Sequence, residues 1–312
     1  MSKEKIYGYK ILFHHGVGDC LRMLTEQPAI NLHSKNNKII IYYAYENFNT
    51  EDYQINYDPM STLHWALIIH EILKNVDFFQ LVGYENYESL DVVELSNWNR
   101  PRPLDEKTQL RNLYPDEYQG FDIPIDTESR NFLDKLLDIP ISIAVQISGR
   151  WPTKNYDPEK YVKLFKLILE KYPNCNIFLF DDPGKTVDPR MLFDIRIVDL
   201  SQRLTGAPLI KLIQEVDYLI CPDSYSKYLR NWAKGRQTVL CSQIHSGVVM
   251  PYTLLRHCFG PYNDLNSARL LFNPLVKILG AKYNNNLTHI DMVDNINEIT
   301  PEEIINSIEI EK

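Results

Sequence analysis

The sequence predicts an α/β protein built from parallel strands and covering helices. Between residues 141 and 240, short apolar strands alternate with helical segments of about ten residues or more, which is typical of a parallel sheet covered on both faces. Three junctions between a strand and the following helix carry polar residues, as expected where ligands bind at the carboxyl ends of strands. A length of 312 residues suggests roughly two domains.

The first half opens with a strand at residues 9–13, then a glycine-containing turn that ends at Asp19, then a helix from residue 20. Further strands are expected at 38–44, 78–81 and 90–95, and a helix at 61–74. Within that helix one apolar face is formed by Leu63, Ala66, Leu67, His70 and Leu73. We therefore expect His70 to be packed on this face rather than to bind a ligand, and the same holds for His64.

Residues 96–123 lack periodicity and are rich in Asn, Arg, Pro, Asp and Tyr. A connection of this length often forms a lid or a binding loop. A helix at 127–137 then leads into the strand at 141, and we place a domain boundary there. The predicted domains are residues 1–138 and residues 139–312.

The second half is predicted to be a Rossmann-like domain. Its expected strands are 141–147, 176–180, 195–198, 217–221 and 237–240, and its expected helices are 158–172, 207–215 and 226–234. Asp157-Pro158 and Thr300-Pro301 are typical helix starts, with a capping side chain followed by proline at the first helical position. The half contains no G-x-G-x-x-G, so the pattern does not indicate a dinucleotide site.

The junction at Asp223-Ser224 follows an apolar strand and precedes a helix. Backbone N–H groups, a hydroxyl and the positive end of a helix dipole together suit a phosphate. The alternative is that both residues only cap the helix, since both types are favoured at that position. A second loop of the same design, residues 148–154, follows the strand at 141–147 and favours the phosphate interpretation.

Composition limits the classes of function. The net charge of −8 and the pI near 5.5 argue against broad affinity for nucleic acid. Five cysteines form no C-x-x-C pair, which disfavours a disulfide framework or a structural zinc site. With no secretory signal and no apolar run long enough to span a membrane, we expect a cytoplasmic protein.

Several motifs together resemble glycosyltransferase family nine, which includes the lipopolysaccharide heptosyltransferases. The matching segments are Gly18-Asp19, the loop around Lys154, Asp223-Ser224, and the stretch from Asp199 to Ile213. Tyr225 and Tyr228 stand where the family has glycine and histidine. The resemblance implies the GT-B fold, in which two Rossmann-like domains face each other across a cleft.

The resemblance also implies roles for individual residues. Asp19 would be the catalytic base that takes the proton of the acceptor hydroxyl. A nucleotide-sugar donor would meet the second domain at Arg150, Lys154, Asp223, Ser224, Tyr225 and Ser226. The acceptor would meet the first domain and the long loop at His14, His15, Arg100 and Arg102. No metal cofactor is expected; the one adjacent acid pair, Asp181-Asp182, suits Mg²⁺ less well than a solvated turn or a contact to a ribose or base.

We therefore predict an inverting, metal-independent glycosyltransferase that moves a hexosyl, heptosyl or pentosyl group onto a glycan or a lipid-linked acceptor. One alternative is a phage-type transferase that acts on a hydroxymethylated DNA base, because the long loop places arginines beside aromatic residues. Another is a non-catalytic module of the same fold that binds a nucleotide sugar or a partner.

Overall fold

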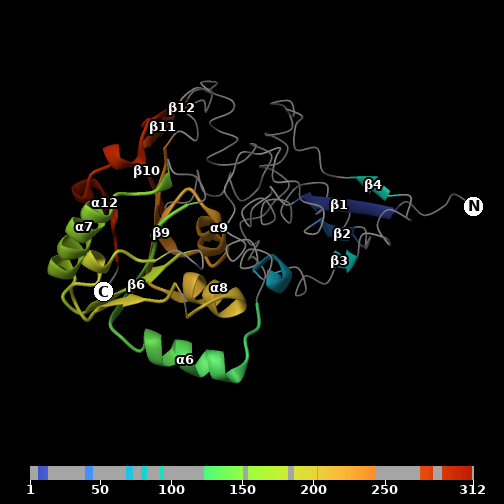
Figure 1. Ribbon diagram of the computed structural model, residues 1–312, viewed down its shortest axis with the longest axis horizontal. Helices are drawn as coiled ribbons and strands as arrows, with labels where there is room; N and C mark the ends of the chain where they lie inside the picture. Colours follow the sequence, from blue (N-terminus) through green and yellow to red (C-terminus); the bar gives the residue numbers. More distant parts are fainter. Residues whose placement is uncertain are drawn as a thin grey trace, which may run out of the picture.

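The computed structural model describes residues 6–12, 39–44, 68–72, 79–82, 92–94, 123–149, 154–181, 186–201, 203–242, 275–283 and 290–310. These residues form two parallel sheets, one from each half of the chain, and a short antiparallel pair near the end (Figure 1). The α/β class predicted from the sequence is confirmed.

The first sheet has the order β3-β2-β1-β4, and its strands are all parallel. The strands are β1 (Ile6–Leu12), β2 (Ile39–Ala44), β3 (Phe79–Val82) and β4 (Val92–Glu94). β1 lies at the centre, with Tyr7 opposite Ile39 of β2 and opposite Val93 of β4. Each expected strand of the first half is present, with its ends shifted by no more than three residues.

A helical turn at residues 68–72 corrects the expectation for His70. Its buried residues are Ile68, Ile69 and Ile72, at 0 to 2% exposure, whereas His70 is exposed. The buried side of the helix is therefore set by the isoleucines, and His70 lies on the other side. His64 lies outside the described residues.

The second sheet has the order β10-β9-β8-β5-β6-β7, again with every pair parallel. Its strands are β5 (Ile141–Gln146), β6 (Cys175–Phe180), β7 (Ile197–Asp199), β8 (Tyr218–Pro222), β9 (Arg236–Leu240) and β10 (Val276–Leu279). After β5, the chain places β6 and β7 on one side of it, and then β8, β9 and β10 on the other side. This is the Rossmann order, and its direction reverses between β5 and β8.

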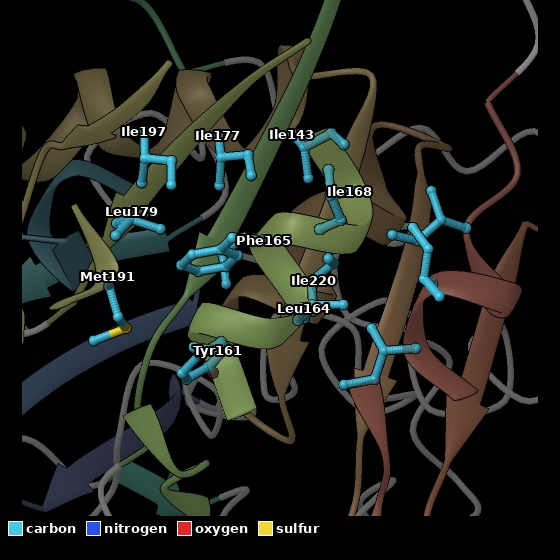
Figure 2. Close-up of a cluster of buried hydrophobic side chains, with 14 of the residues drawn as sticks. Ile143, Tyr161, Leu164, Phe165, Ile168, Ile177, Leu179, Met191, Ile197 and Ile220 are labelled. Atoms are coloured by element: carbon cyan, nitrogen blue, oxygen red, sulfur yellow. The ribbon is translucent and has the colours of Figure 1, made fainter. Parts of the chain in front are cut away.

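One face of this sheet packs on α7 (Pro158–Lys171) and α12 (Pro301–Ser307). Figure 2 shows Leu164, Phe165 and Ile168 of α7 directed at the strands. The strands meet them with alternate residues, as the pleat requires, among them Ile143, Ile177, Leu179, Ile197 and Ile220. These side chains form a buried core that fixes α7 against β5 and its neighbouring strands.

The opposite face is covered by α8 (Gly206–Glu215) and α9 (Tyr225–Trp232), which lie on the far side of the sheet from α7 (Figure 1). Every residue of β5 is buried, in agreement with a sheet that has helices on both faces. Because side chains alternate along a strand, Gln146 belongs to the set that points away from the α7 core. That direction brings its amide to α9.

The last segment returns to α7. After the hairpin of β11 (Ala281–Tyr283) and β12 (Ile290–Met292), the short helix η4 (Ile296–Glu298) precedes α12. α12 begins after Thr300 as the sequence predicts, and Thr300 and Glu303 form a capping box there. The hydroxyls of Tyr156 and Tyr172 donate to the carbonyl oxygens of Ile299 and Ile308, at 2.9 and 3.0 Å.

Helix α6 (Thr127–Leu137) is capped by Asp126, whose carboxylate accepts from the N–H of Ser129. Arg130 of α6 makes a two-bond ion pair with Glu215 at the end of α8, with both distances 2.8 Å. α6 is thus joined to a helix of the second sheet. Among the described helices, none has the length and hydropathy needed to cross a bilayer.

Candidate functional site

The candidate site lies where the strand order of the second sheet reverses. β5 and β8 are neighbours there, with Val145 paired to Ile220, so the loops that follow the two strands leave the same edge side by side. In open α/β sheets this crevice is the usual ligand site. The loop after β5 carries Lys154, and the loop after β8 carries Asp223 and Ser224.

Lys154 connects the two loops. Its ammonium donates to the carbonyl oxygen of Asp223 at 2.5 Å and to the carboxylate Oδ2 of Asp223 at 3.0 Å. Lys227, in the first turn of α9, donates to the other carboxylate oxygen, Oδ1. The side chains of Asp223 and Lys227 are 3% and 1% exposed, whereas that of Lys154 is 12% exposed. Of these three residues, Lys154 is therefore the one that reaches the surface.

Ionic contacts keep the buried side chains of Asp223 and Lys227 in their charged forms. Burial alone would raise the pKa of Asp223, but the ammonium groups of Lys154 and Lys227 outweigh it and hold the pKa below its usual value. Burial would likewise lower the pKa of Lys227, but the Asp223 carboxylate raises it above the ordinary lysine value. One carboxylate and at least the buried Lys227 ammonium are therefore ionised at neutral pH.

Gln146 links the two loops a second time. Its amide nitrogen donates to the carbonyl oxygen of Ser148 at 2.9 Å and to the hydroxyl of Ser224 at 3.0 Å. Its amide oxygen accepts from the hydroxyl of Ser226 at 2.6 Å. Three of the four hydrogen-bonding positions of this buried side chain are thus used, by Ser148 and Ser224 of the two loops and by Ser226 of α9.

The Ser224 hydroxyl is oriented by this contact. Ser224 stands at the N-cap of α9, yet its side chain makes no capping hydrogen bond, and α9 has no acidic residue in its first turn. Because its oxygen accepts from the Gln146 amide, its own hydrogen points away from that amide. The capping alternative is therefore not what the Ser224 side chain does, and the positive end of α9 is left without a carboxylate in its first turn.

Gly149 allows the close approach of Lys154. A Cβ atom at Gly149 would lie 2.8 Å from the Cβ of Lys154 and 3.1 Å from its Cδ. The N–H of Gly149 also donates to the side-chain oxygen of Asn155 at 3.2 Å. Gly149 and Lys154 are therefore close together, and Lys154 reaches Asp223.

The end of β6 contributes a buried acid. The carboxylate of Asp181 is 7% exposed and accepts from the hydroxyl of Ser148 at 2.8 Å. This residue is not a solvated turn, which was one expectation for the pair Asp181-Asp182; Asp182 lies outside the described residues. Nearby, the Tyr161 hydroxyl donates to the carbonyl oxygen of Ile147 at 2.9 Å, and burial raises its pKa.

The structure places five of the expected site residues together. Lys154, Asp223, Ser224, Tyr225 and Ser226 all lie at the β5/β8 reversal, but only Lys154 and Ser224 retain appreciable exposure. Tyr225 is 6% and Ser226 0% exposed, so both are packed inside the protein. The remaining expected residues, Asp19, Arg150, His14, His15, Arg100 and Arg102, lie outside the described residues.

Two residues of the site were not anticipated. Lys227 lies four residues after Asp223, a spacing that places two side chains on the same side of a helix, and this was the available signal. Gln146 ends a buried and mostly apolar strand, and an amide in such a strand has to find buried partners. Across the described segments, no three His, Cys, Asp or Glu side chains are grouped so that they could hold a metal ion.

Comparison with solved structures identifies the fold. A glycosyl transferase of family 9 from Veillonella parvula is 12% identical, covers 97% of this chain and 96% of its own, and superposes with a TM-score of 0.53. The E. coli ADP-heptose LPS heptosyltransferase II is 10% identical, covers 96% and 97%, and has a TM-score of 0.51. The chain has the GT-B fold. This likeness in fold covers nearly the whole of both structures, whereas no protein-family model and no curated protein matches the sequence.

Proposed function

We propose that the protein is a glycosyltransferase that binds the diphosphate of a nucleotide-sugar donor at the β5/β8 reversal. The observation that carries the proposal is the ammonium of Lys154, held at the surface of that crevice by Asp223 and close to the N-terminus of α9. A cation, a directed hydroxyl on Ser224 and a helix N-terminus are the groups that bind phosphate in proteins. The GT-B fold of the chain supports the same assignment.

The chemistry follows from this placement. The bond from the sugar to the diphosphate breaks as the acceptor oxygen bonds to the sugar, and negative charge grows on the departing diphosphate. Lys154 and Ser224 would stabilise that charge without a metal ion, and preorganised donors of this kind typically contribute about 2.7 to 4 kcal/mol each. Asp19 would take the acceptor proton, with attack from the opposite face and inversion at the sugar carbon.

Asp181 is the further donor-site candidate. It follows the second strand of the Rossmann unit, where an acidic residue commonly binds ribose hydroxyls. Its side chain is held by Ser148, which belongs to the loop before Lys154. We therefore propose that the ribose lies toward β6 and the diphosphate toward β8.

The test is binding of ADP, GDP, UDP and CDP by calorimetry, followed by sugar transfer from the corresponding nucleotide sugars. Lys154→Met should weaken the diphosphate that binds best by about 10- to 100-fold, the usual value of a charged hydrogen bond. Lys171→Met is the matched control, because Lys171 also donates to backbone carbonyls but lies at the other end of α7. Absence of binding to all four nucleotides, or equal loss in the control, would contradict the proposal.

Activity assays address the remaining parts. Transfer that persists in EDTA supports metal independence, and the anomeric configuration of the product, read by NMR, reports inversion or retention. Loss of transfer in Asp19→Ala with unchanged nucleotide binding supports the base and rules out a non-catalytic module. A glycan or lipid-linked acceptor is proposed; salt-sensitive retention on duplex DNA would favour the modified-base acceptor instead.

A further inference from the structure

Lys227 is a buried cation for which the proposed function gives no role. It is the third residue of α9 and its side chain is 1% exposed. Two effects oppose a lysine at this place. Burial removes the ammonium from water, and the first turn of a helix is the positive end of its dipole.

The structure shows how this cation is accommodated. Lys227 donates to Oδ1 of Asp223, and its ammonium lies 4.6 Å from the centroid of the Tyr228 ring. The other carboxylate oxygen of Asp223, Oδ2, receives Lys154 at 3.0 Å. One carboxylate therefore serves two ammonium groups, one buried and one at the surface.

The charge of the group depends on Lys227. With Lys227 removed, Asp223 and Lys154 would form a pair whose charges cancel, and the attraction of Lys154 for an anion would fall. With Lys227 present, these three side chains together carry one positive charge. Lys227 is too deeply buried to meet a bound molecule, so it would act only through Asp223 and Lys154.

We propose that Lys227 is a positioning residue of the donor site, which occupies half of the Asp223 carboxylate so that Lys154 keeps its attraction for a diphosphate. This inference rests on the proposed function and deepens it. It assigns the positive charge of the site to a pair of lysines that share one acid, rather than to Lys154 alone.

The experiment compares four proteins: the unaltered chain, Lys227→Met, Asp223→Asn, and the double variant. Dissociation constants for ADP, GDP, UDP and CDP are measured by calorimetry at one low salt concentration, with melting temperatures recorded in parallel. Lys227→Met should bind the best nucleotide about 10- to 100-fold more weakly. Asp223→Asn should bind more tightly than Lys227→Met, because it removes the negative charge that would otherwise pair with Lys154.

The double variant separates charge from structure. It restores one net positive charge at Lys154, so it should bind at least about tenfold more tightly than Lys227→Met, whereas damage to the fold would be additive. Affinity unchanged in Lys227→Met, or a double variant no tighter than Lys227→Met, would overturn the inference.

Two further outcomes remain decisive. If Lys227→Met does not fold, the double variant should bind about tenfold more weakly than Asp223→Asn, and equal affinities would refute the role of Lys227. If the unaltered chain binds none of the four nucleotides, the proposed function itself fails. Binding by the unaltered chain with no effect of Lys227→Met refutes this inference alone.

Discussion

The change Gly149→Ala tests whether the loop after β5 depends on close contact with Lys154. The added Cβ would lie 2.8 Å from the Cβ of Lys154. Because the Cβ of Lys154 is fixed to its own backbone, a rotamer change cannot relieve this contact, and the backbone of one residue has to move. Gly149 does not have a positive φ, so the cost comes from the contact and not from backbone strain.

The expected loss of stability is about 1 to 3 kcal/mol, the usual cost of adding a methyl group to a packed position. Urea unfolding measures it. The displaced Lys154 should also weaken diphosphate binding, which calorimetry detects in the same protein. The cost should be smaller in a Lys154→Gly background, where the opposing Cβ is absent, and this double-mutant cycle isolates the contact.

The reasoning is refuted if Gly149→Ala costs the same free energy of unfolding with and without the Lys154 side chain. In that case the glycine would be needed for a reason other than the approach of Lys154. A stable Gly149→Ala protein that binds diphosphate as tightly as the unaltered chain would likewise show that the position of Lys154 tolerates the shift.

Three further predictions concern the same half of the protein. Gln146→Leu should lower the free energy of unfolding by about 2 to 3 kcal/mol, because it leaves the buried hydroxyl of Ser226 without its acceptor; urea unfolding measures this. Lys234, which follows α9 with a φ of 54°, adopts the left-handed conformation that glycine favours, so Lys234→Gly should raise the melting temperature by an amount equivalent to about 0.5 to 1 kcal/mol. Because the pKa of Asp223 is lowered in the folded protein, its carboxylate contributes stability above the unfolded pKa of about 3.9, and this contribution is lost as the pH falls from there through the lower, folded pKa. Asp223→Asn should therefore flatten the acid side of the curve of unfolding free energy against pH, and unfolding experiments from about pH 2 to 6 measure this.

Strands and helices of the second half were predictable because the sequence shows them locally. The apolar run that becomes β5 and the capping pair Asp157-Pro158 before α7 identify their elements without tertiary information. β10 was not predicted: it has four residues, and its pairing with β9 is what makes it a strand. The error at His70 has a similar origin, since a helix with apolar residues on several sides does not reveal from spacing alone which side is covered.

Of the candidate site, the sequence indicated the two loops and several of their residues but not their internal contacts. Lys154 and Asp223 are 69 positions apart, and only the parallel pairing of β5 with β8 brings them together. The burial of Lys227 was likewise hidden, because a lysine in the first turn of a helix is usually in solvent. Asp19 as the base and Lys154 as a phosphate ligand stay predictions.

The covering of the α7 core by residues near the end of the chain affects how the protein is made. Ile296, Ile299, Ile304 and Ile308 belong to the same buried cluster as β5 and α7, although about 130 residues separate them. During synthesis from the N-terminus, β5 and α7 emerge long before those isoleucines exist. Until they are made, part of the apolar surface of this core stays exposed, and transiently exposed apolar surface is prone to aggregation.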